Sequence, residues 1–272
     1  MLDNRCLSAD FSYLCRKQFL SFEMKKAIVM GASSGIGHEV ARLLIGQGWT
    51  VGVAARRVEK LEDLRDCAPE RVFTARIDVT DAHADEALCR FIERMGGLDL
   101  YFHAAGIGRK NPELQAETEL KTMQTNALGF ARMVGEAYRY FALNGGGHIA
   151  CVTSIAGTKG MGPAPAYSAT KAMQSTYLQA LEQLAGNKRQ NIHFTDIRPG
   201  FVDTPLLDNT SHFPMLMRTD KVALHILKAI EKQRHVCIID CRWRMVTALW
   251  RRIPNWVWRR MRLIKNQDEL HH

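Results

Sequence analysis

The stretch Lys26-Ala-Ile-Val-Met-Gly-Ala-Ser-Ser-Gly-Ile-Gly-His-Glu-Val-Ala41 decides the fold. Residues 27–30 form an apolar run that predicts a buried strand, and apolar residues at helical spacing follow the last glycine. Between strand and helix lie Gly31, Gly35 and Gly37, where a Cβ would keep a diphosphate away from the backbone. The free N–H groups and positive dipole at the helix start favour phosphates. The stretch predicts a dinucleotide-binding turn, although an ordinary strand–helix turn would show the same glycines.

Composition limits the class of protein. The 272 residues and 46% hydrophobic content fit one α/β domain with a large core. The net charge of +9 indicates a polyanionic partner, such as a phosphorylated cofactor, an anionic membrane or a nucleic acid. The seven cysteines form no Cys-x-x-Cys pair and no zinc-spaced set with histidine, so we expect a reducing compartment and no metal. No apolar run reaches the ~18 residues that span a bilayer, and we expect a cytoplasmic protein.

The first residues precede the predicted domain. Residues 1–23 lack the basic start, apolar core and cleavage site of a signal peptide. Met24-Lys25-Lys26 then leads directly into the first strand. We therefore expect residues 1–23 to be a leader or a peripheral arm, and residues 24–240 to be the catalytic domain.

A second strand, predicted over residues 49–55, is followed by Arg56 and Arg57. The second strand of a dinucleotide-binding fold ends beside the adenosine ribose. A carboxylate there binds the 2′-hydroxyl of NAD, whereas an arginine accommodates the 2′-phosphate of NADP. Arg56 lies nineteen positions after Gly37, and no carboxylate stands beside it. The pair favours NADP(H) over NAD(H); the alternative is a solvated basic loop.

The next two predicted strands end in residues that suit the rest of a dinucleotide. Residues 71–79 predict the third strand, in which Asp78 either caps the following helix or faces the adenine edge. Residues 98–106 predict a fourth strand, whose small final residues leave room for a flat ring or a ribose. The cofactor contacts expected here are Asp78, Val79, Ala104, Ala105 and Gly106.

Ser154 ends a predicted fifth strand over residues 148–154, at the edge where ligands bind in open α/β sheets. Tyr167 and Lys171 follow, four residues apart and therefore on one face of a predicted helix. A lysine ammonium lowers the pKa of a nearby phenol from about 10, so Tyr167 could exchange a proton with a carbonyl or alcohol oxygen. Ser154 would hold the same oxygen. An exposed Tyr–Lys pair on a surface helix is the alternative for these two residues alone.

The remaining pattern completes one doubly wound domain. A helix predicted over residues 120–143 contains Asn126, which alone would be a structural asparagine. The sixth strand, residues 191–200, ends at Pro199-Gly200, and the apolar segment after it predicts either a substrate lid or ordinary packing. A further helix and strand follow. Strands and helices alternate throughout, which predicts a Rossmann-type parallel sheet of about seven strands.

These residues together resemble the classical short-chain dehydrogenase/reductase family, over roughly residues 25–240. The resemblance rests on a turn similar to the family's cofactor turn and on a match to its catalytic tetrad. The turn comprises Gly31, Ser33, Ser34, Gly35, Ile36 and Gly37. The tetrad comprises Asn126, Ser154, Tyr167 and Lys171. The segment with Pro199, Gly200, Val202 and Thr204 is similar to the one that contacts the nicotinamide carboxamide.

The resemblance also implies roles and partners. Lys171 would bind the nicotinamide ribose as well, and Asn126 would hold a water of a proton relay. A homodimer or homotetramer would form through the helices that carry Asn126 and Tyr167. Two scaffold positions depart from the family: Met30 replaces a threonine, and Ala104 replaces an asparagine that ties strands together. Neither touches the tetrad, so we expect activity.

Residues 241–272 form a basic, tryptophan-rich tail in which the family pattern ends. Arginines alternate with tryptophans, and no acidic residue lies between Cys241 and Asp268. Apolar residues at helical spacing predict two short amphipathic helices separated by Pro254. These helices either pack on the body or a partner subunit, or contact an anionic membrane through residues 242–265. Nucleic acid is not expected, because no binding module accompanies the basic residues.

The function predicted from the sequence is that of an NADP(H)-dependent oxidoreductase. It would interconvert a ketone or aldehyde and an alcohol, on an apolar small molecule, with Tyr167 as the acid/base. Two alternatives stay open: a non-catalytic NADP(H)-sensing protein, and a peripheral membrane reductase of a lipid carbonyl.

Overall fold

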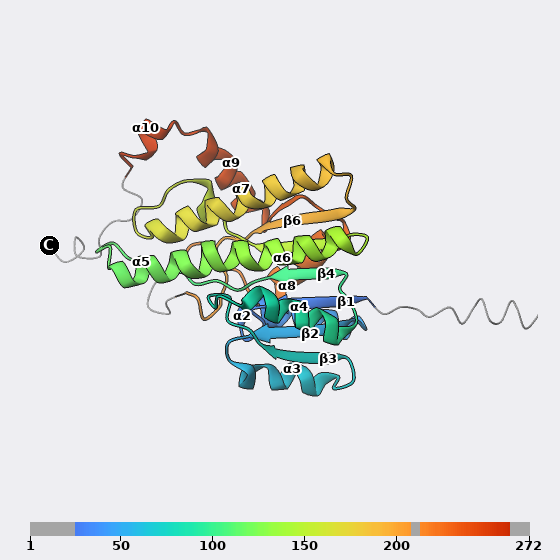
Figure 1. Ribbon diagram of the computed structural model, residues 1–272. Coiled ribbons are helices and arrows are strands. Elements are labelled where there is room, and N and C mark those ends of the chain that lie inside the picture. The colour runs from blue at the N-terminus through green and yellow to red at the C-terminus, as the bar shows by residue number, and fades with distance from the viewer. Residues whose placement is uncertain (1–24, 208–212, 262–272) are drawn as a thin grey trace, which may run out of the picture.

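A parallel sheet forms the centre of the molecule, with helices on both faces (Figure 1). The structure is a computed structural model that describes residues 25–207 and 213–261. The strands are β1 (Lys26–Met30), β2 (Thr50–Ala55), β3 (Val72–Arg76), β4 (Leu100–His103), β5 (Gly147–Val152), β6 (Ile192–Arg198) and β7 (Val236–Ile238). Their order is β3-β2-β1-β4-β5-β6-β7. The predicted seven-stranded doubly wound sheet is confirmed, and its order reverses between β1 and β4, where ligands bind in such sheets.

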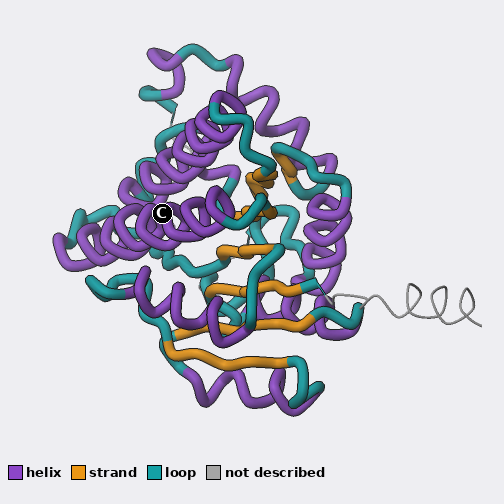
Figure 2. Tube along the Cα trace, turned by 45° about the vertical axis from the view of Figure 1, so that its right-hand side comes forward, coloured by secondary structure: helices purple, strands orange, loops and turns teal. Residues whose placement is uncertain are grey.

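The helices alternate with the strands along the chain. They are α2 (Gly35–Gly46), α3 (Glu62–Cys67), α4 (Ala84–Met95), α5 (Ala116–Met123), α6 (Phe130–Leu143), α7 (Pro165–Asn187), α8 (Thr219–Glu231), α9 (Cys241–Arg252) and α10 (Asn255–Trp258). Two 3₁₀ turns, η1 (Val58–Leu61) and η3 (Ile155–Thr158), and one π turn, η2 (Gln124–Gly129), interrupt the connections. Figure 2 shows the same layers with the strands between the helices.

Alternate residues of the strands bury their side chains in two separate cores. Ala27 and Val29 of β1 face a core shared with α2, α8 and α9, whereas Ile28 and Met30 face one shared with α4, α6 and α7. All four side chains are essentially inaccessible. Burial on both faces is why the parallel strands read as continuous apolar runs.

Two predicted elements have different bounds in the structure. The helix expected over residues 120–143 is α5, the π turn η2 and α6, so Asn126 lies in the π turn. The third strand ends at Arg76 instead of residue 79, and α4 begins only at Ala84. Asp78 therefore lies in a turn and does not cap a helix, which corrects that expectation. Its carboxylate Oδ1 instead accepts hydrogen bonds from the N–H (3.0 Å) and hydroxyl (2.8 Å) of Thr80.

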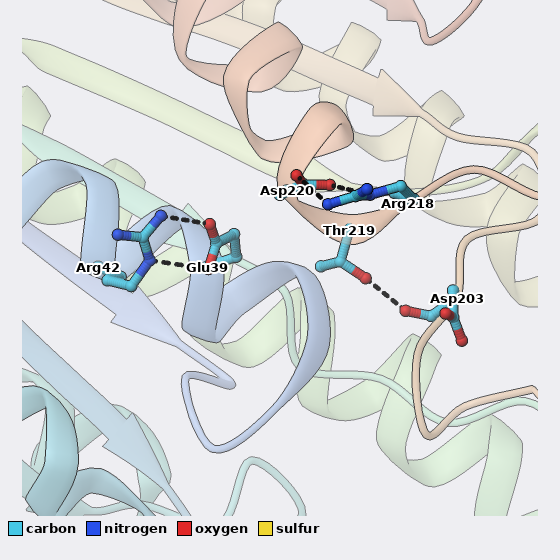
Figure 3. Close-up of polar contacts among 6 residues, drawn as sticks. All are labelled: Glu39, Arg42, Asp203, Arg218, Thr219 and Asp220. Carbon is cyan, nitrogen blue, oxygen red and sulfur yellow. Dashed lines mark hydrogen bonds and ion pairs between the residues drawn. The ribbon is translucent and has the colours of Figure 1, made fainter.

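The segment after β6 is tied together at its base. The N–H of Met217 donates to the carbonyl of Phe201 (2.9 Å), and the N–H of Asp203 donates to that of Met217 (2.9 Å). The Thr219 hydroxyl donates to the Asp203 carbonyl, next to the Arg218–Asp220 pair at the start of α8 (Figure 3). The two ends of this apolar segment thus stay together, while residues 208–212 lie outside the described part.

The tail packs on the body through tryptophans. Trp243 of α9 is buried against Phe201, with ring centres 5.6 Å apart, and contacts Trp250, which contacts Trp258. The indole N–H of Trp258 donates to the carbonyl of Gly160 (2.8 Å). The sequence left packing and membrane contact open, and packing holds for this inner face. None of the helices in the described part of the chain is both long and apolar enough to cross a bilayer.

Candidate active site

The glycine turn after β1 is closed by contacts within its own backbone. A Cβ on Gly37 would lie 2.3 Å from the carbonyl oxygen of Gly31. A Cβ on Gly31 would lie 2.6 Å from the backbone nitrogen of Ala105, and its φ of +91° also favours glycine. Both glycines are therefore required by the fold of the turn itself, before any phosphate is considered.

The N-terminus of α2 is open to an anion. Ser34 precedes the helix in an extended conformation, and its side chain makes no capping hydrogen bond. No acidic residue occupies the first turn. The residues Ser33, Ser34, Gly35 and Ile36 are all partly accessible. Uncapped N–H groups, the helix dipole and partly accessible small residues fit a diphosphate at this end of the sheet.

Arg56 and Arg57 are exposed directly after β2. Neither guanidinium has a hydrogen-bond or ion-pair partner among residues 25–207 and 213–261, so both are available to a ligand. Asp78 lies on the neighbouring strand connection, after β3. The expected positions around the adenosine half therefore lie on adjacent strands, at one edge of the sheet.

His103 supports the end of β4 in a way that the sequence did not indicate. Its Nε2–H donates to the carbonyl of Ala105 (3.1 Å), while its Nδ1 accepts from the hydroxyl of Tyr101 (2.9 Å). Burial lowers the pKa of His103 to about 3, so the imidazole is neutral. This bond fixes the short loop against which Gly31 packs. The family has an asparagine at the position of Ala104 that ties strands together. In this chain, the neighbouring His103 instead supplies a side-chain hydrogen bond at the end of the strand.

Asn126 is completely buried and clamps the loop that follows β4. Its Oδ1 accepts from the N–H of Ile107 (2.9 Å), and its Nδ2–H donates to the carbonyl of Ile107 (2.6 Å). The π turn η2 supplies the extra residue that turns this side chain inward, and such turns are frequent at functional sites. The asparagine thus holds a loop that borders the tyrosine.

Ser154 and Tyr167 meet at the carboxyl edge of the sheet. The Ser154 hydroxyl oxygen accepts from the N–H of Ala156 (3.1 Å), and the Ser154 side chain lies close enough to the Tyr167 phenol to lower its pKa. Gly108 lies against the tyrosine, since a Cβ there would be 2.6 Å from the ring. Burial raises the pKa of Tyr167, and the nearby Ser154 side chain opposes this rise. The sequence predicted that Lys171 lowers the pKa of Tyr167, but the pKa is raised. The cause is the burial of Tyr167, which removes water from the phenolate and could not be seen in the sequence.

Lys171 lies one helical turn after Tyr167, with its side chain buried. Its Nζ is 5.8 Å from the centre of the Tyr167 ring. Two of its protons are given to the carbonyl of Val152 and to Oε1 of Gln174, each at 3.0 Å. Burial lowers its pKa to about 8, so the ammonium form still dominates at neutral pH. One N–H direction remains for a ligand beside the tyrosine.

Gln174 is a site residue that the sequence reasoning missed. It has no exposed surface, and its amide joins Lys171 to the carbonyl of Asn126, to which its Nε2–H donates (2.8 Å). Both the side-chain amide and the backbone carbonyl of Asn126 thus have hydrogen-bond partners in the protein. The available signal was a polar residue three positions after Lys171, on the buried face of the same helix.

The loop after β6 joins the cofactor turn to the tail. The methyl of Thr204 would lie 3.1 Å from a Cβ on Gly35, so this threonine packs on the glycine turn. Gly200 is covered by Trp243, whose Nε1 would be 2.3 Å from a Cβ there. That buried indole N–H has no hydrogen-bond partner in the described residues. Thr204 thus lies beside the turn, while contact of Pro199, Gly200, Val202 and Thr204 with a nicotinamide stays a prediction.

The apolar segment after this loop divides into packed and exposed side chains. Met217 is buried, and the Phe213 ring lies 4.8 Å from that of Phe201. The Lys110 ammonium is 5.7 Å from the Phe213 ring centre, so the segment reaches the loop that follows β4. Leu206 and Leu216 remain 43% and 48% exposed. Both predicted uses, packing and cover, are therefore compatible with different residues of one segment.

The structure thus brings all four tetrad residues to one place, while their catalytic roles stay a prediction. A family model described as short chain dehydrogenase matches residues 25–214. An uncharacterized oxidoreductase of Myxococcus xanthus is 36% identical over 204 residues, which are 72% of this chain and 79% of that protein. The matched part of the chain holds the glycine turn and the tetrad.

Two solved structures share the fold. A short-chain dehydrogenase from Streptomyces avermitilis has a TM-score of 0.74 at 23% identity, over 84% of this chain and 92% of that one. An alcohol dehydrogenase from the archaeon Thermococcus sibiricus, complexed with 5-hydroxy-NADP, has a TM-score of 0.69 at 25% identity, over 80% and 95%. The first of these supports the fold alone.

Proposed function

We infer that this chain, which belongs to the short-chain dehydrogenase family and is an oxidoreductase, uses NADP(H) to interconvert a ketone or aldehyde and an alcohol. The placement of the Tyr167 phenol near Ser154, with the buried Lys171 ammonium 5.8 Å from the centre of the tyrosine ring, carries this proposal. A phenol in such a place can transfer a proton to or from a substrate oxygen. It lies at the carboxyl edge of the sheet, next to the uncapped glycine turn.

The proposed mechanism assigns one task to each side chain. A nicotinamide cofactor held at this site would exchange a hydride with the carbon that carries the reacting oxygen. Ser154 donates a hydrogen bond to that oxygen and fixes its position. During reduction Tyr167 gives its proton to the oxygen, and the ammonium of Lys171 stabilises the phenolate that remains. Asn126 holds the Ile107 backbone beside the site.

The proposed cofactor contacts lie at the ends of five strands, β1, β2, β3, β4 and β6, and on α7. Arg56 and Arg57 would bind the 2′-phosphate of NADP(H), because they are exposed and without ionic partners in the described chain. Lys171 would also bind the nicotinamide ribose through its remaining N–H. The residues proposed to bind the cofactor are Gly31, Ser33, Ser34, Gly35, Ile36, Gly37, Arg56, Arg57, Asp78, Val79, Ala104, Ala105, Gly106, Tyr167, Lys171, Pro199, Gly200, Val202 and Thr204.

The first experiment is a fluorescence titration with NADPH and, separately, NADH. We expect tighter binding of NADPH, and Arg56→Ala should weaken NADPH by about tenfold while leaving NADH unchanged, since only NADPH carries the extra phosphate. Arg234→Ala removes the same charge before β7, at the opposite edge of the sheet, and is the matched control. Equal affinities in the native protein would contradict the NADP(H) preference.

Turnover is tested with a panel of ketones, aldehydes and alcohols. Tyr167→Phe should lower kcat by about 10²–10⁴-fold or more, while the NADPH affinity stays within about threefold. Tyr177→Phe removes a hydroxyl from the same helix away from the tetrad and should have little effect. Unchanged turnover in Tyr167→Phe would disprove the proposed acid/base.

Gln174 is proposed to position Lys171, and its test is a pH profile. Gln174→Leu removes the acceptor at 3.0 Å, so the pKa of Lys171 should fall and reductive activity should decline at a lower pH than in the native protein. Gln174→Glu adds a negative charge and should move the same limb to higher pH. Identical profiles for both variants would leave Gln174 a packing residue.

An apolar substrate and a homo-oligomer are the remaining parts of the proposal. Leu206 and Leu216 are exposed beside the site and supply apolar surface for a substrate. Leu120 and Leu128, on α5 and η2, are 68% and 57% exposed, which supports a subunit contact on the helix that carries Asn126. Leu128→Glu should convert a dimer or tetramer to monomer in size-exclusion chromatography with light scattering.

A further inference from the structure

α9 presents two chemically different faces. Trp243 and Thr247 are buried against the body. Met245 and Leu249, four residues apart and therefore on one face, are 68% and 63% exposed. Side chains this exposed contribute little to the packing that holds the helix on the body. Met245 and Leu249 therefore present an apolar surface to the outside of the molecule.

α10 repeats this arrangement. Trp258 is buried and donates to Gly160, whereas Trp256, two residues earlier, is 64% exposed. The Arg260 guanidinium lies 5.9 Å from the Trp256 ring centre. Met261 follows at 42% exposed. The second helix thus adds an exposed tryptophan with an arginine beside it to the apolar pair of the first.

The charge on this outer face is of one sign. Its exposed arginines are Arg242, Arg244, Arg251, Arg252, Arg259 and Arg260. No aspartate or glutamate occurs from Cys241 to Met261. Only Arg242 forms an ion pair with a described residue, namely Asp240 before the helix. The outer face therefore offers a cluster of arginines whose charges the described protein does not neutralise.

We propose that the outer face of α9 and α10 binds the surface of an anionic lipid bilayer. Arginines would lie among the lipid phosphates, while Met245, Leu249 and Trp256 enter the boundary between headgroups and acyl chains. Tryptophan prefers this boundary because its ring is apolar and its N–H polar. Nucleic acid would use the arginines but not the exposed methionine and leucine.

A second copy of the chain fits this face less well than a bilayer does. A two-fold contact places the same arginine-rich patch of both copies face to face, so the arginines of one copy would repel those of the other. A bilayer instead supplies negative charge and apolar depth together. The helices are already held by Trp243 and by the bonds of Lys159 to Ile253 and Asn255, so binding requires little further ordering.

The test is co-sedimentation of the full chain with vesicles. Vesicles of phosphatidylcholine with phosphatidylglycerol should bind at least about tenfold more protein than phosphatidylcholine alone. High salt should reduce this binding, because the arginine–phosphate attraction is screened. Equal binding to both kinds of vesicle, or to neither, overturns the proposal. NADPH titration of the same samples reports folding and the cofactor site separately.

Matched variants separate the contribution of the arginines to vesicle binding from that of the exposed apolar side chains. Arg244→Gln with Arg251→Gln should weaken binding to anionic vesicles by about tenfold or more, and Met245→Ser with Leu249→Ser by about fivefold or more. Arg65→Gln with Arg90→Gln, and Leu143→Ser with Leu224→Ser, make the same changes at exposed positions elsewhere and should stay within about twofold. If the tail variants change the oligomeric state instead of vesicle binding, the face is a contact between copies and the proposal fails.

Discussion

Gly37 and Gly200 occupy equally crowded positions that are closed in different ways. A Cβ on Gly37 would lie 2.3 Å from the Gly31 carbonyl, six residues away in the same turn. A Cβ on Gly200 would lie 2.3 Å from the indole of Trp243, which belongs to the tail. The position of Gly37 is thus closed by a residue of the same turn, whereas that of Gly200 is closed by a distant part of the chain.

This difference changes the status of the tail. The family model ends at residue 214, so α9 and α10 lie beyond the matched part. Trp243 nevertheless belongs to the same core as β1 and α2. An extension outside the family pattern therefore packs on a loop of the proposed cofactor site, and the inner face of the tail belongs to the same hydrophobic core as the sheet.

The largest effect is expected from adding a methyl at each glycine. Gly37→Ala should abolish NADPH binding and destabilise the protein by about 3 kcal/mol, because a backbone carbonyl cannot move aside. Gly200→Ala should also impair binding, but Gly200→Ala with Trp243→Leu should recover much of it, since a smaller side chain makes room. The measurements are NADPH titration and urea unfolding.

The comparison would break if the second substitution restored nothing. The comparison would also be contradicted if Gly37→Ala bound NADPH like the native protein. The turn would then be able to accommodate a methyl group that its close contacts should exclude. Trp243→Leu alone, which opens space without a clash, is the control.

Next in size is the loss of the tryptophan itself. Trp243→Ala should lower the free energy of unfolding by about 3–5 kcal/mol, the range for a buried aromatic side chain. Trp256→Ala, at an exposed position of the same tail, should change it by less than about 0.5 kcal/mol. Urea unfolding measures both, and similar values would show that the inner face does not anchor the tail.

As the pH falls, the stability contributed by neutral His103, near the glycine turn, should be lost before the stability contributed by ionised Asp240, at the start of the tail. The pKa of His103 is lowered by burial from 6.5 to about 3, so between these values the unfolded chain binds the proton and the folded one does not. Stability therefore falls as pH falls through this window, by up to about 1.4 kcal/mol per pH unit. The pKa of Asp240, which caps α9, is lowered from 3.8 to about 2 by its hydrogen bonds with Arg242, so its contribution is lost only below pH 3.8.

Urea unfolding at a series of pH values tests this order. His103→Asn should flatten the slope between pH 6.5 and pH 4, although His148, whose pKa burial lowers to about 4, keeps a slope of its own. Asp240→Asn should leave that slope unchanged. If Asp240→Asn removed the dependence of the unfolding free energy on pH in this range, the assignment of that dependence to His103 would be wrong.

The smallest effect is expected at the junction between the tail and the loop after β5. The Lys159 ammonium donates to the Ile253 carbonyl (3.0 Å) and to Asn255 Oδ1 (2.6 Å). Lys159→Met keeps the aliphatic stem and should destabilise by about 1–2 kcal/mol. Lys188→Met, at the exposed end of α7, is the control, and equal values would show that these bonds add nothing.

Local patterns were sufficient for the fold and for the placement of the proposed site. A strand, a glycine turn and a helix stand within sixteen residues, and Tyr167 and Lys171 are one helical turn apart. Each of these relations is set by the period of one element. That is why the sheet and the pairing of Tyr167 with Lys171 could be predicted without knowledge of any long-range contact, whereas the meeting of all four tetrad residues was implied by the family resemblance.

What the sequence could not provide was the partner of each buried group. The bond from His103 to Ala105, the bridge through Gln174 and the rise in the pKa of Tyr167 depend on which groups surround a side chain. Periodicity shows that a face is buried, but not what lies against it. The tail shows the same limit, because its tryptophans could not be divided into inner and outer ones until α9 was seen on Phe201.

The contact of Trp243 with Gly200 also sets an order during synthesis. N-terminal parts of a chain fold while later parts are still being made. The glycine turn needs only β1, α2 and the strand end at Ala105, all made early, so it can close on the growing chain. The Pro199–Gly200 loop stays without its cover until α9 has been translated. A nascent chain therefore contains every residue of the glycine turn long before it contains the tryptophan that covers the Pro199–Gly200 loop.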